Sequence, residues 1–285
     1  MAMSVNTNIG AMAALQSLNS TTKGLAQVQS RINTGLNVSS TKDDSAKYTV
    51  AQKLRGDMGE LSAVGSSLNR AKSTTDVAVA GAEQVSDLLN QMQSKAKEAS
   101  DTGIDAASRT AITKDLNALK QQVETVIDSS EFNGTNLLKG TGAATDGTVS
   151  ALQSLGSTGA SGTLTVGNQG FTAKAATGFG AAVGTDIALA DGAAADTLMG
   201  TLKTFSAAVR TSLSDLGSAS RKIDGQVSFN SKLSDVIEAG IGNMVDADLA
   251  KESAKLQALQ VKQQLGVQAL SIANQAPQSI TSLFR

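Results

Sequence analysis

Proline is almost absent from this chain, and this absence restricts the possible fold more than any other feature. Pro277 is the single proline among 285 residues. Because proline removes a backbone hydrogen-bond donor and interrupts helices, its near absence leaves long helices unbroken. Aromatic residues make up only 2% of the chain, with no Trp, so the large rings of an ordinary globular core are scarce. The sequence therefore predicts a mainly α fold built from long helices that pack through aliphatic side chains.

Several function classes are excluded by composition. The chain has no Cys and no His, which removes disulfides, Cys/His zinc sites and imidazole catalysis. The net charge of −1 argues against nucleic acid or an anionic membrane surface as a partner. No apolar run of about 18 residues is present, and the N-terminal stretch lacks the basic and apolar regions of a cleavable signal peptide. We expect no membrane insertion and no cleavage by signal peptidase.

The two ends of the chain are free of side-chain charge. The first charged residue is Lys23, and none lies between Lys262 and Arg285. Exposed ends are normally charged and frayed. Ends without charge suit a crowded, desolvated setting, where an unpaired charge is costly. We expect these ends to become fully ordered only on assembly.

Apolar residues at helical spacing predict the helices. The first stripe contains Leu15, Leu18, Thr22, Leu25, Gln29, Ile32 and Leu36, with Gly35 and the polar residues after it as a break. Further stripes run from Leu54 to Ala96, from Ile112 to Val126 and from Leu198 to Ile237, and GIGN at 240–243 is expected to interrupt the last of these.

A final helix is expected to begin after Asp246 or Asp248 and to end near residue 284. It carries two apolar stripes, one with Leu249, Leu256, Leu259, Leu270 and Ala273, the other with Ala258, Val261, Leu265 and Ile272. Because one partner covers one face of a helix, two stripes require neighbours on two sides.

The middle of the chain differs in character. EFNGTNLL at 131–138 places Asn-Gly between apolar residues, which is a strong hairpin signal. Residues 140–192 are rich in Gly, Thr, Ser and Ala, and GTLTVGNQGFTAKA alternates in the manner of short strands. We expect a small, β-containing or loosely ordered insertion here.

Three motifs resemble functional sites but favour simpler interpretations. Asp43 and Asp44 could be a catalytic or metal-binding pair, but no cluster of His, Cys or Glu accompanies them. A helix N-cap is the better interpretation, with Arg31 or Lys42 as ion-pair partners. GFGAAVG at 178–184 has the wrong spacing for a nucleotide loop, and the acids of DADLAKE at 246–252 are simplest as a cap. We expect no active site, no cofactor, no metal and no small-molecule substrate.

Four segments closely resemble bacterial flagellin. They are VNTNIGAMAALQSLN at 5–19, RINTGLNVSSTKDDSAKY at 31–48, EFNGTNLL at 131–138 and the stretch from DADLAKES at 246 to the final LFR. The resemblance covers residues 4–140 and 195–285. It implies a secreted, extracellular subunit that polymerises with copies of itself into the flagellar filament and serves swimming motility.

The resemblance also implies a division of the chain. Residues 1–33 and 245–285 would form an inner coiled coil, and 34–45 a connecting loop in which Arg31, Asp43 and Asp44 serve as turn and cap. Residues 46–140 and 193–244 would form an α-helical rod, and 141–192 a variable outer segment. The implied polymerisation interface on the inner helices contains Leu15, Leu18, Leu25, Ile32, Leu249, Leu256, Leu259, Leu265, Leu270 and Ile272.

Partners follow from the same resemblance. It implies export through the flagellar type III export apparatus, an export chaperone on the C-terminal helix, and contact with the filament cap and hook-junction proteins. Many flagellins also carry an Arg-rich segment that an innate immune receptor recognises. Here the aligned stretch, LNQMQSKAKEAS at 89–100, includes Leu89 and Glu98 and is degenerate, because Gln91 and Gln93 stand where arginines would be. Because Gln cannot make a bidentate Arg contact, we expect weak or no recognition.

Three alternatives remain for comparison. A hook–filament junction protein shares the terminal helices of flagellin but forms a single ring. A metallopeptidase within a flagellin frame would need HExxH, which the absence of His excludes. A signalling or secretion coiled coil would lack the FNG hairpin and would not need two charge-free ends.

Overall fold

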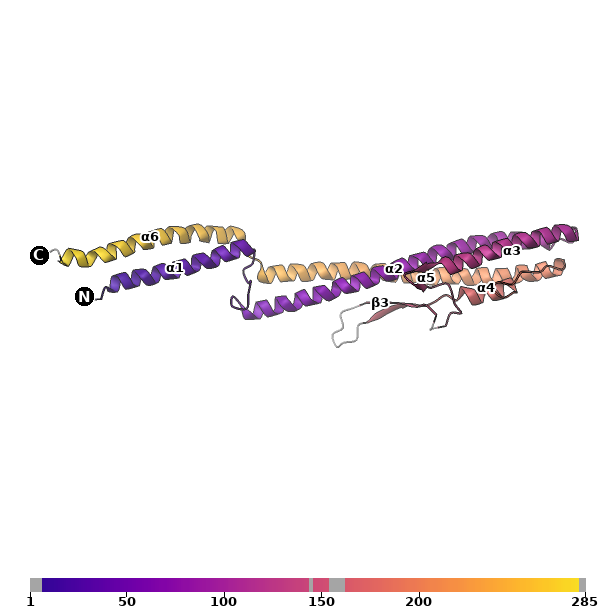
Figure 1. Cartoon of the computed structure of the whole chain (residues 1–285), viewed down its shortest axis with the longest axis horizontal. Coiled ribbons are helices and arrows are strands. Elements are labelled where there is room, and N and C mark those ends of the chain that lie inside the picture. The colour runs from indigo at the N-terminus through magenta and orange to yellow at the C-terminus, as the bar shows by residue number, and fades with distance from the viewer. Residues whose placement is uncertain (1–6, 144–145, 154–161, 282–285) are drawn as a thin grey trace. The chain divides into compact units, whose positions relative to one another are not determined.

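The computed structural model describes residues 7–143, 146–153 and 162–281, with side chains as far as Gln275. The described elements, in chain order, are α1 (Ile9–Thr34), α2 (Ser45–Ala99), α3 (Ala106–Ser129), β1 (Glu131–Phe132), β2 (Thr135–Asn136), β3 (Val149–Leu152), β4 (Thr163–Val166), α4 (Phe171–Phe179), α5 (Gly192–Val245) and α6 (Leu249–Thr281). Figure 1 shows the dominance of helices. The predicted fold class, mainly α with a small β-containing insertion, is confirmed.

The chain divides into two compact units. The first comprises the residues up to Met58 and those from Asp235 onward, and the second comprises Gly59–Ser234. The helices α2 and α5 each contribute to both units. The four-part division implied by the resemblance stays a prediction.

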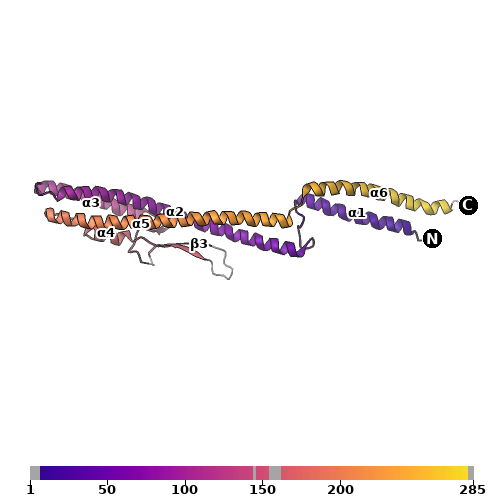
Figure 2. The ribbon, with the colours of Figure 1, turned by 180° about the vertical axis from the view of Figure 1, so that it is seen from behind.

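The first unit holds α1 and α6 as an antiparallel pair, which lie side by side in both Figure 1 and Figure 2. Next to them, the loop after α1 is bonded to the link between α5 and α6. The amides of Asn37 and Val38 donate to the Val245 carbonyl at 2.7 and 3.2 Å, and the amide of Ala247 donates to the Gly35 carbonyl at 2.9 Å. A small core of Val38, Ala51, Ile241 and Val245 lies beneath this loop.

The second unit has one continuous hydrophobic core. It draws on α2, α3, α4 and α5, on the β3–β4 hairpin, and on Leu137 and Leu138 directly after β2. Its large, fully buried side chains include Leu68, Leu89, Met92, Leu116, Leu202, Leu216 and Ile223. Their helical spacing matches the predicted stripes, so aliphatic packing supplies most of the burial, as composition required.

Three of the aromatic rings pack together between α4 and α5. Phe171 and Phe179 of α4 both pack edge-on against Phe205 of α5, with ring centroids 6.3 and 5.7 Å apart. Such T-shaped pairs contribute beyond their buried area. The expectation of strand-like alternation across GTLTVGNQGFTAKA was therefore half wrong. TLTV forms β4, but FTAKA begins α4, because Phe171, Ala175 and Phe179 recur every four residues and all reach the core.

The Asn-Gly hairpin is confirmed. β1 and β2 pair antiparallel, with Phe132 opposite Thr135. Both turn residues have positive φ, +50° at Asn133 and +78° at Gly134, as a tight hairpin turn of the primed type requires. A second hairpin pairs β3 with β4.

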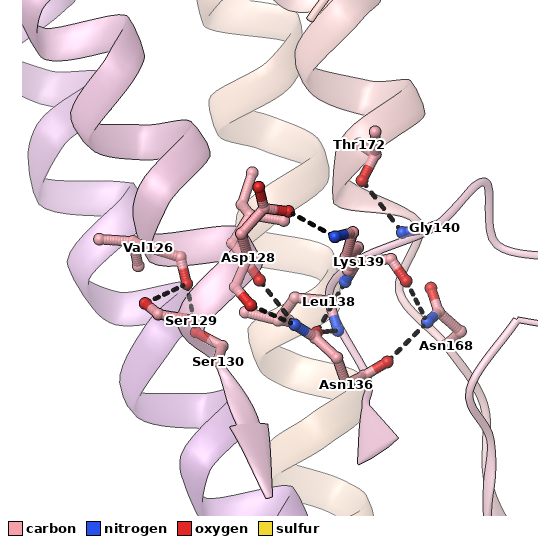
Figure 3. A network of polar contacts seen from close by, with 11 residues as sticks. Val126, Asp128, Ser129, Ser130, Asn136, Leu138, Lys139, Gly140, Asn168 and Thr172 are labelled. Carbon is pink, nitrogen blue, oxygen red and sulfur yellow. Dashed lines mark hydrogen bonds and ion pairs between the residues drawn. The ribbon is translucent and has the colours of Figure 1, made fainter. Parts of the chain in front are cut away.

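Asn136 organises the chain after the first hairpin (Figure 3). Its Nδ2 donates to the Ile127 carbonyl at 2.7 Å, and its Oδ1 accepts from the amides of Leu138 and Lys139, both at 2.8 Å. Asn168 Nδ2 donates in turn to the Lys139 carbonyl at 2.8 Å. The end of α3, the hairpin and the segment before α4 are thereby held together by one partly buried polar cluster.

One expected helix boundary was wrong, and a second was confirmed at one of its two alternatives. The GIGN stretch at 240–243 does not interrupt α5, which continues to Val245, because isolated glycines weaken a helix but still form its hydrogen bonds. The α6 cap is Asp248, whose Oδ1 accepts from the Lys251 amide at 3.0 Å, whereas Asp246 lies in a bridge with Leu36. The expected end of α6 near residue 284 lies outside the described residues.

Candidate functional site

The α1–α6 pair has a regular seam. The least exposed residues of α1 recur in alternating steps of three and four, which is the spacing of a coiled coil. They are Ala11, Ala14, Leu18, Thr21, Leu25, Val28 and Ile32. The seam of α6 has the same spacing and contains Glu252, Leu256, Leu259, Gln263, Gly266, Leu270 and Ala273. The real seam therefore differs from the predicted stripe, since Leu15, Thr22 and Gln29 lie outside it and are exposed.

Small residues let the two helices pack tightly. A Cβ on Gly266 would lie 3.3 Å from Cδ1 of Leu18, and one on Gly24 would lie 3.6 Å from Cδ1 of Leu259. Each glycine thus receives a leucine from the opposite helix. Asn8, the N-cap of α1, accepts from the Ala11 amide at 3.0 Å and donates to the Ala273 carbonyl at 2.7 Å. One side chain therefore caps α1 and ties it to α6.

A charged cluster closes the other end of the seam. Glu252 is 5% exposed, and its Oε1 lies 2.6 Å from Lys255 Nζ and 3.7 Å from Arg31 Nη1. Arg31 Nε and Glu252 Oε2 are buried and have no hydrogen-bond partner among the described residues. The expected pairing of Arg31 with Asp43 or Asp44 was wrong, because the antiparallel register brings the only acid of α6 next to Arg31. A buried pair of this kind favours one register over its alternatives.

Large apolar side chains outside the seam are left uncovered by this pairing. On α1 they are Ile9, Met12 and Leu15, with exposed fractions of 74%, 62% and 48%. On α6 they are Leu249, Val261, Leu265, Val267 and Ile272, all at least half exposed. A groove of about 800 Å³ runs along α1 and is lined by Met12, Leu15, Gln16, Asn19, Ser20, Lys23, Gly24 and Gln27. Exposed apolar rows of this extent are typical of a surface that another molecule covers.

The ten residues expected at a polymerisation interface therefore fall into two groups. Leu18, Leu25 and Ile32 of α1 lie in the seam with Leu256, Leu259 and Leu270 of α6. Leu15, Leu249, Leu265 and Ile272 face outward and are exposed. Sequence reasoning missed Asn8, Gly24, Gly266 and Glu252. The small residues would have been found if Ala and Gly had been counted as seam positions.

Asp43 and Asp44 have separate roles in the connecting loop. Asp44 is the N-cap of α2, and its Oδ1 accepts from the Lys47 amide at 3.1 Å. Asp43 closes the preceding turn, because its Oδ2 accepts from the amides and hydroxyls of Ser39 and Ser40 at 3.0–3.1 Å. The hydrogen bonds from Ser39, the hydroxyl first, and then those from Ser40 lower the pKa of Asp43 below its ordinary value.

The segment compared with the immune-receptor motif lies on α2. Leu89 is buried in the core of the second unit, whereas Gln91 and Glu98 are exposed. Gln93 is partly buried, and its Nε2 has no hydrogen-bond partner within the described part of the chain. Glu98 pairs with Lys95 at 3.6 Å, and Lys95 also pairs with Asp115 of α3 at 3.3 Å.

The described residues hold no cluster of three or more His, Cys, Asp or Glu side chains placed to bind a metal ion. Within the same residues, no helix combines the length and apolar character needed to cross a membrane. The features that stand out are instead a paired seam, a loop fixed by two acids and uncovered apolar rows. They define a helical structural protein whose first and last helices carry exposed apolar surface outside their mutual contact.

Comparison with known proteins gives the family. The model of the bacterial flagellin N-terminal helical region matches residues 5–143, and that of the C-terminal helical region matches residues 186–284. The chain is 44% identical to flagellin FljM of Caulobacter vibrioides, over 99% of this chain and 98% of that one. It is 36% identical to a flagellin of Brucella melitensis, over 99% of each chain. The chain belongs to the bacterial flagellin family, and it is a structural subunit of the flagellar filament, an extracellular appendage.

A solved structure supports the fold independently. The putative flagellar hook-associated protein from Vibrio parahaemolyticus aligns with a TM-score of 0.54 at 14% identity, over 72% of this chain and all of that one. Identity this low shows a shared fold alone. The relatives that match along the whole chain are flagellins, so the comparisons do not favour the hook–filament junction alternative.

Proposed function

We propose that the uncovered apolar rows of α1 and α6 are the surfaces through which copies of this chain assemble. The observation that carries the proposal is the exposure of Val261, Leu265 and Ile272 on a helix whose other face is already paired with α1. Burying one such side chain contributes about 1.5–3 kcal/mol. Because every copy adds several of them, assembly supplies the second neighbour that the single chain lacks.

Growth of purified subunits onto short filament seeds tests this proposal. Leu265→Gln removes an apolar group that is 57% exposed in the single chain, so the folded subunit should keep its helix content. We expect the critical concentration for growth to rise several-fold. Gln264→Ala, at the neighbouring exposed position, is the matched control and should grow as the unchanged chain does. Growth of Leu265→Gln at the unchanged critical concentration would refute the proposal.

The same assay separates the two assembly classes. A filament subunit should elongate seeds without a fixed limit, and a chain lacking residues 245–285 should not elongate them at all. A full-length chain that stops at a small closed ring would instead support a hook–filament junction protein. The inner coiled coil (1–33 and 245–285), the loop (34–45), the rod (46–140 and 193–244) and the outer segment (141–192) are our proposed assignment of parts within the filament.

Secretion belongs to the same proposal. The subunit leaves the cell through the flagellar type III apparatus, with an export chaperone on α6 and the cap and junction proteins at the filament ends. The exposed apolar row of α6 is the feature that a chaperone would cover before export. The test is whether the subunit needs the chaperone to stay soluble in the cytoplasm. We expect Leu265→Gln to make the subunit's solubility less dependent on the chaperone. Nothing in this role requires catalysis, a cofactor or a small-molecule substrate.

Weak recognition by the innate immune receptor for flagellin is also proposed. Gln91 and Gln93 cannot supply the planar, charged fork of an arginine. We expect little activation of receptor-expressing cells by the purified monomer. We also expect the double substitution Gln91→Arg and Gln93→Arg to increase it, and strong activation by the unchanged monomer would contradict the proposal.

A further inference from the structure

Charge is distributed unevenly between the paired helices α1 and α6 and the rest of the chain. Of the 24 basic and 25 acidic side chains, these two helices hold five basic ones and a single acid, Glu252, which gives them a net charge of +4. The remaining 19 basic and 24 acidic side chains give the rest of the chain a net charge of −5. A chain that is almost neutral as a whole thus has a basic part and an acidic part, which two copies can present to each other.

Three lysines of α6 form a basic row. They are Lys251, Lys255 and Lys262, all exposed. Intervals of four and seven residues place their side chains on one face of the helix. Lys255 Nζ lies 2.6 Å from Oε1 of Glu252, but Arg31 Nη1 approaches the same oxygen at 3.7 Å, so two cations share one acid. The basic row therefore carries more positive charge than its own helix pair can neutralise.

A row of the opposite charge lies on α2 in the second unit. This acidic row consists of Asp76, Glu83 and Asp87, all exposed and on one face of the helix, at intervals of seven and four residues. Between Lys72 and Lys95 they are the only charged side chains of α2. Asp76 Oδ1 accepts a 3.4 Å hydrogen bond from the Ser220 hydroxyl. Within the described part of the chain, the carboxylates of Glu83 and Asp87 have no hydrogen-bond or ion-pair partner. The acidic row is thus largely free to pair with another molecule.

We propose that the basic row of one copy docks antiparallel onto the acidic row of a neighbouring copy. The spacing of the two rows is mirrored, because intervals of four and seven on α6 meet intervals of seven and four on α2 when the helices run in opposite directions. Each row extends about 16 Å along its helix. The pairs formed in this way are Lys251 with Asp87, Lys255 with Glu83, and Lys262 with Asp76. Among the ion pairs of the described residues, none joins the two rows within one chain.

This contact rests on the proposed function and adds an ionic surface to the apolar one. It joins two different surfaces of the same chain, so every added copy leaves one row unoccupied for the next copy. Contacts of this heterologous kind build open helical assemblies when the rotation between copies does not close a ring. Complementary charge mainly sets the orientation and rate of association. The charged rows would therefore align a new copy, and the exposed apolar rows of α1 and α6 would supply most of the burial.

Charge reversal at one pair tests the proposal in the seeded growth assay with the full-length chain. Lys251 and Asp87 are suited to it because neither side chain has a hydrogen-bond or ion-pair partner among the described residues. Lys251→Glu or Asp87→Lys alone brings like charges together, so each should raise the critical concentration for growth several-fold, and high salt should reduce the effect. An equimolar mixture of the two variants should grow better than either alone, because the reversed charge on one variant meets the opposite reversed charge on the other. Only a contact between copies can produce this rescue, and its absence would overturn the proposal.

A matched variant controls for net charge. Lys203 is exposed on α5 and lies outside both rows, so Lys203→Glu makes the same change in charge and should grow as the unchanged chain does. An equal loss of growth in Lys203→Glu would refute a specific contact between the rows. A loss in Lys251→Glu without a loss in Asp87→Lys would also refute it, since a different acidic surface would then cover the basic row.

The apolar and ionic contacts can fail separately. If Leu265→Gln impairs growth and both charge variants grow normally, the proposed function stands and the contact between the rows is refuted. If the charge variants impair growth and their mixture restores it while Leu265→Gln grows normally, the contact between the rows stands and the apolar surface is refuted. Circular dichroism of each monomer shows that the substitutions leave the helix content unchanged.

Discussion

The side-chain amide of Asn8 donates a 2.7 Å hydrogen bond to the backbone carbonyl of Ala273, across 265 positions of sequence. The same side chain caps α1 by accepting from the Ala11 amide. Local helix capping and a long-range tertiary contact are therefore joined in one residue. The seam between α1 and α6 is fixed at this end by Asn8 and at the other by Arg31 and Glu252.

Substitutions at Asn8 should separate its two roles. Asn8→Asp keeps the acceptor that caps α1 but loses the donor to Ala273, so it should cost about 1 kcal/mol. Asn8→Ala loses both and should cost about 2 kcal/mol. Hydrogen exchange of the α1 and α6 amides in the monomer measures the difference. Exchange in Asn8→Asp equal to that in the unchanged chain would show that the contact to Ala273 contributes nothing, and equal exchange in the two variants would show that the cap contributes nothing.

Glu252 should be the most sensitive polar residue of the seam. Glu252→Ala leaves Arg31 without its buried counter-charge, and we expect a loss of about 1–3 kcal/mol in the stability of the α1–α6 pair. Reversing both charges, Arg31→Glu with Glu252→Arg, should restore part of the loss because the pair is re-formed. Hydrogen exchange along α6 reports the result, and a double variant weaker than both single ones would argue against direct pairing.

Two glycines give opposite predictions for the same substitution. A Cβ on Gly178 would lie 2.5 Å from Cβ of Phe205, so Gly178→Ala should force α4 away from α5 and cost about 1–3 kcal/mol. Gly200 lies in α5 with no atom within 4 Å of an added Cβ, so Gly200→Ala should stabilise the helix by about 0.5–1 kcal/mol. Urea unfolding followed by circular dichroism measures both. A tolerated Gly178→Ala would show that α4 is not packed tightly on Phe205.

Acid should loosen the connecting loop through Asp43. Its folded-state pKa lies below the ordinary value of 3.8, so its contribution to stability is present above that value and is lost as the pH falls through the lowered pKa. We expect the Ser39 and Ser40 amides to lose protection only in strongly acidic solution. Asp43→Asn should remove this acid transition. Asp105→Asn is the control, since the pKa of Asp105 is lowered by a separate cap on α3, and it should leave the loop transition in place.

Sequence reasoning worked where one local rule decides the structure. The hairpin follows from Asn133 and Gly134, which accept positive φ at low cost, and the long helices follow from aliphatic periodicity and the lack of proline. The second apolar stripe predicted for α6 is exposed in the structure at Val261, Leu265 and Ile272.

Sequence reasoning failed where the packing of a residue depends on a segment far away in the sequence. Leu15 was placed with Leu18 in one stripe, but the seam selects Ala11 and Ala14 because glycines and alanines allow close approach. The partner of Arg31 could not be known before the register of α1 against α6 was known. α4 was missed because its core face depends on Phe205, which lies 34 residues beyond Phe171 and 26 beyond Phe179 in the chain.

The seam has a further consequence for the order in which the molecule forms. A contact between Asn8 and Ala273 closes a loop of 265 residues. The chain loses conformational entropy when this loop closes, before the contacts of the seam can stabilise it. Contacts this non-local fold slowly compared with those within a single helix. Until α6 has been synthesised, α1 lacks the helix that pairs with its seam. The seam of a nascent subunit therefore cannot form until synthesis is almost complete, because its two helices are the first and the last elements of the chain.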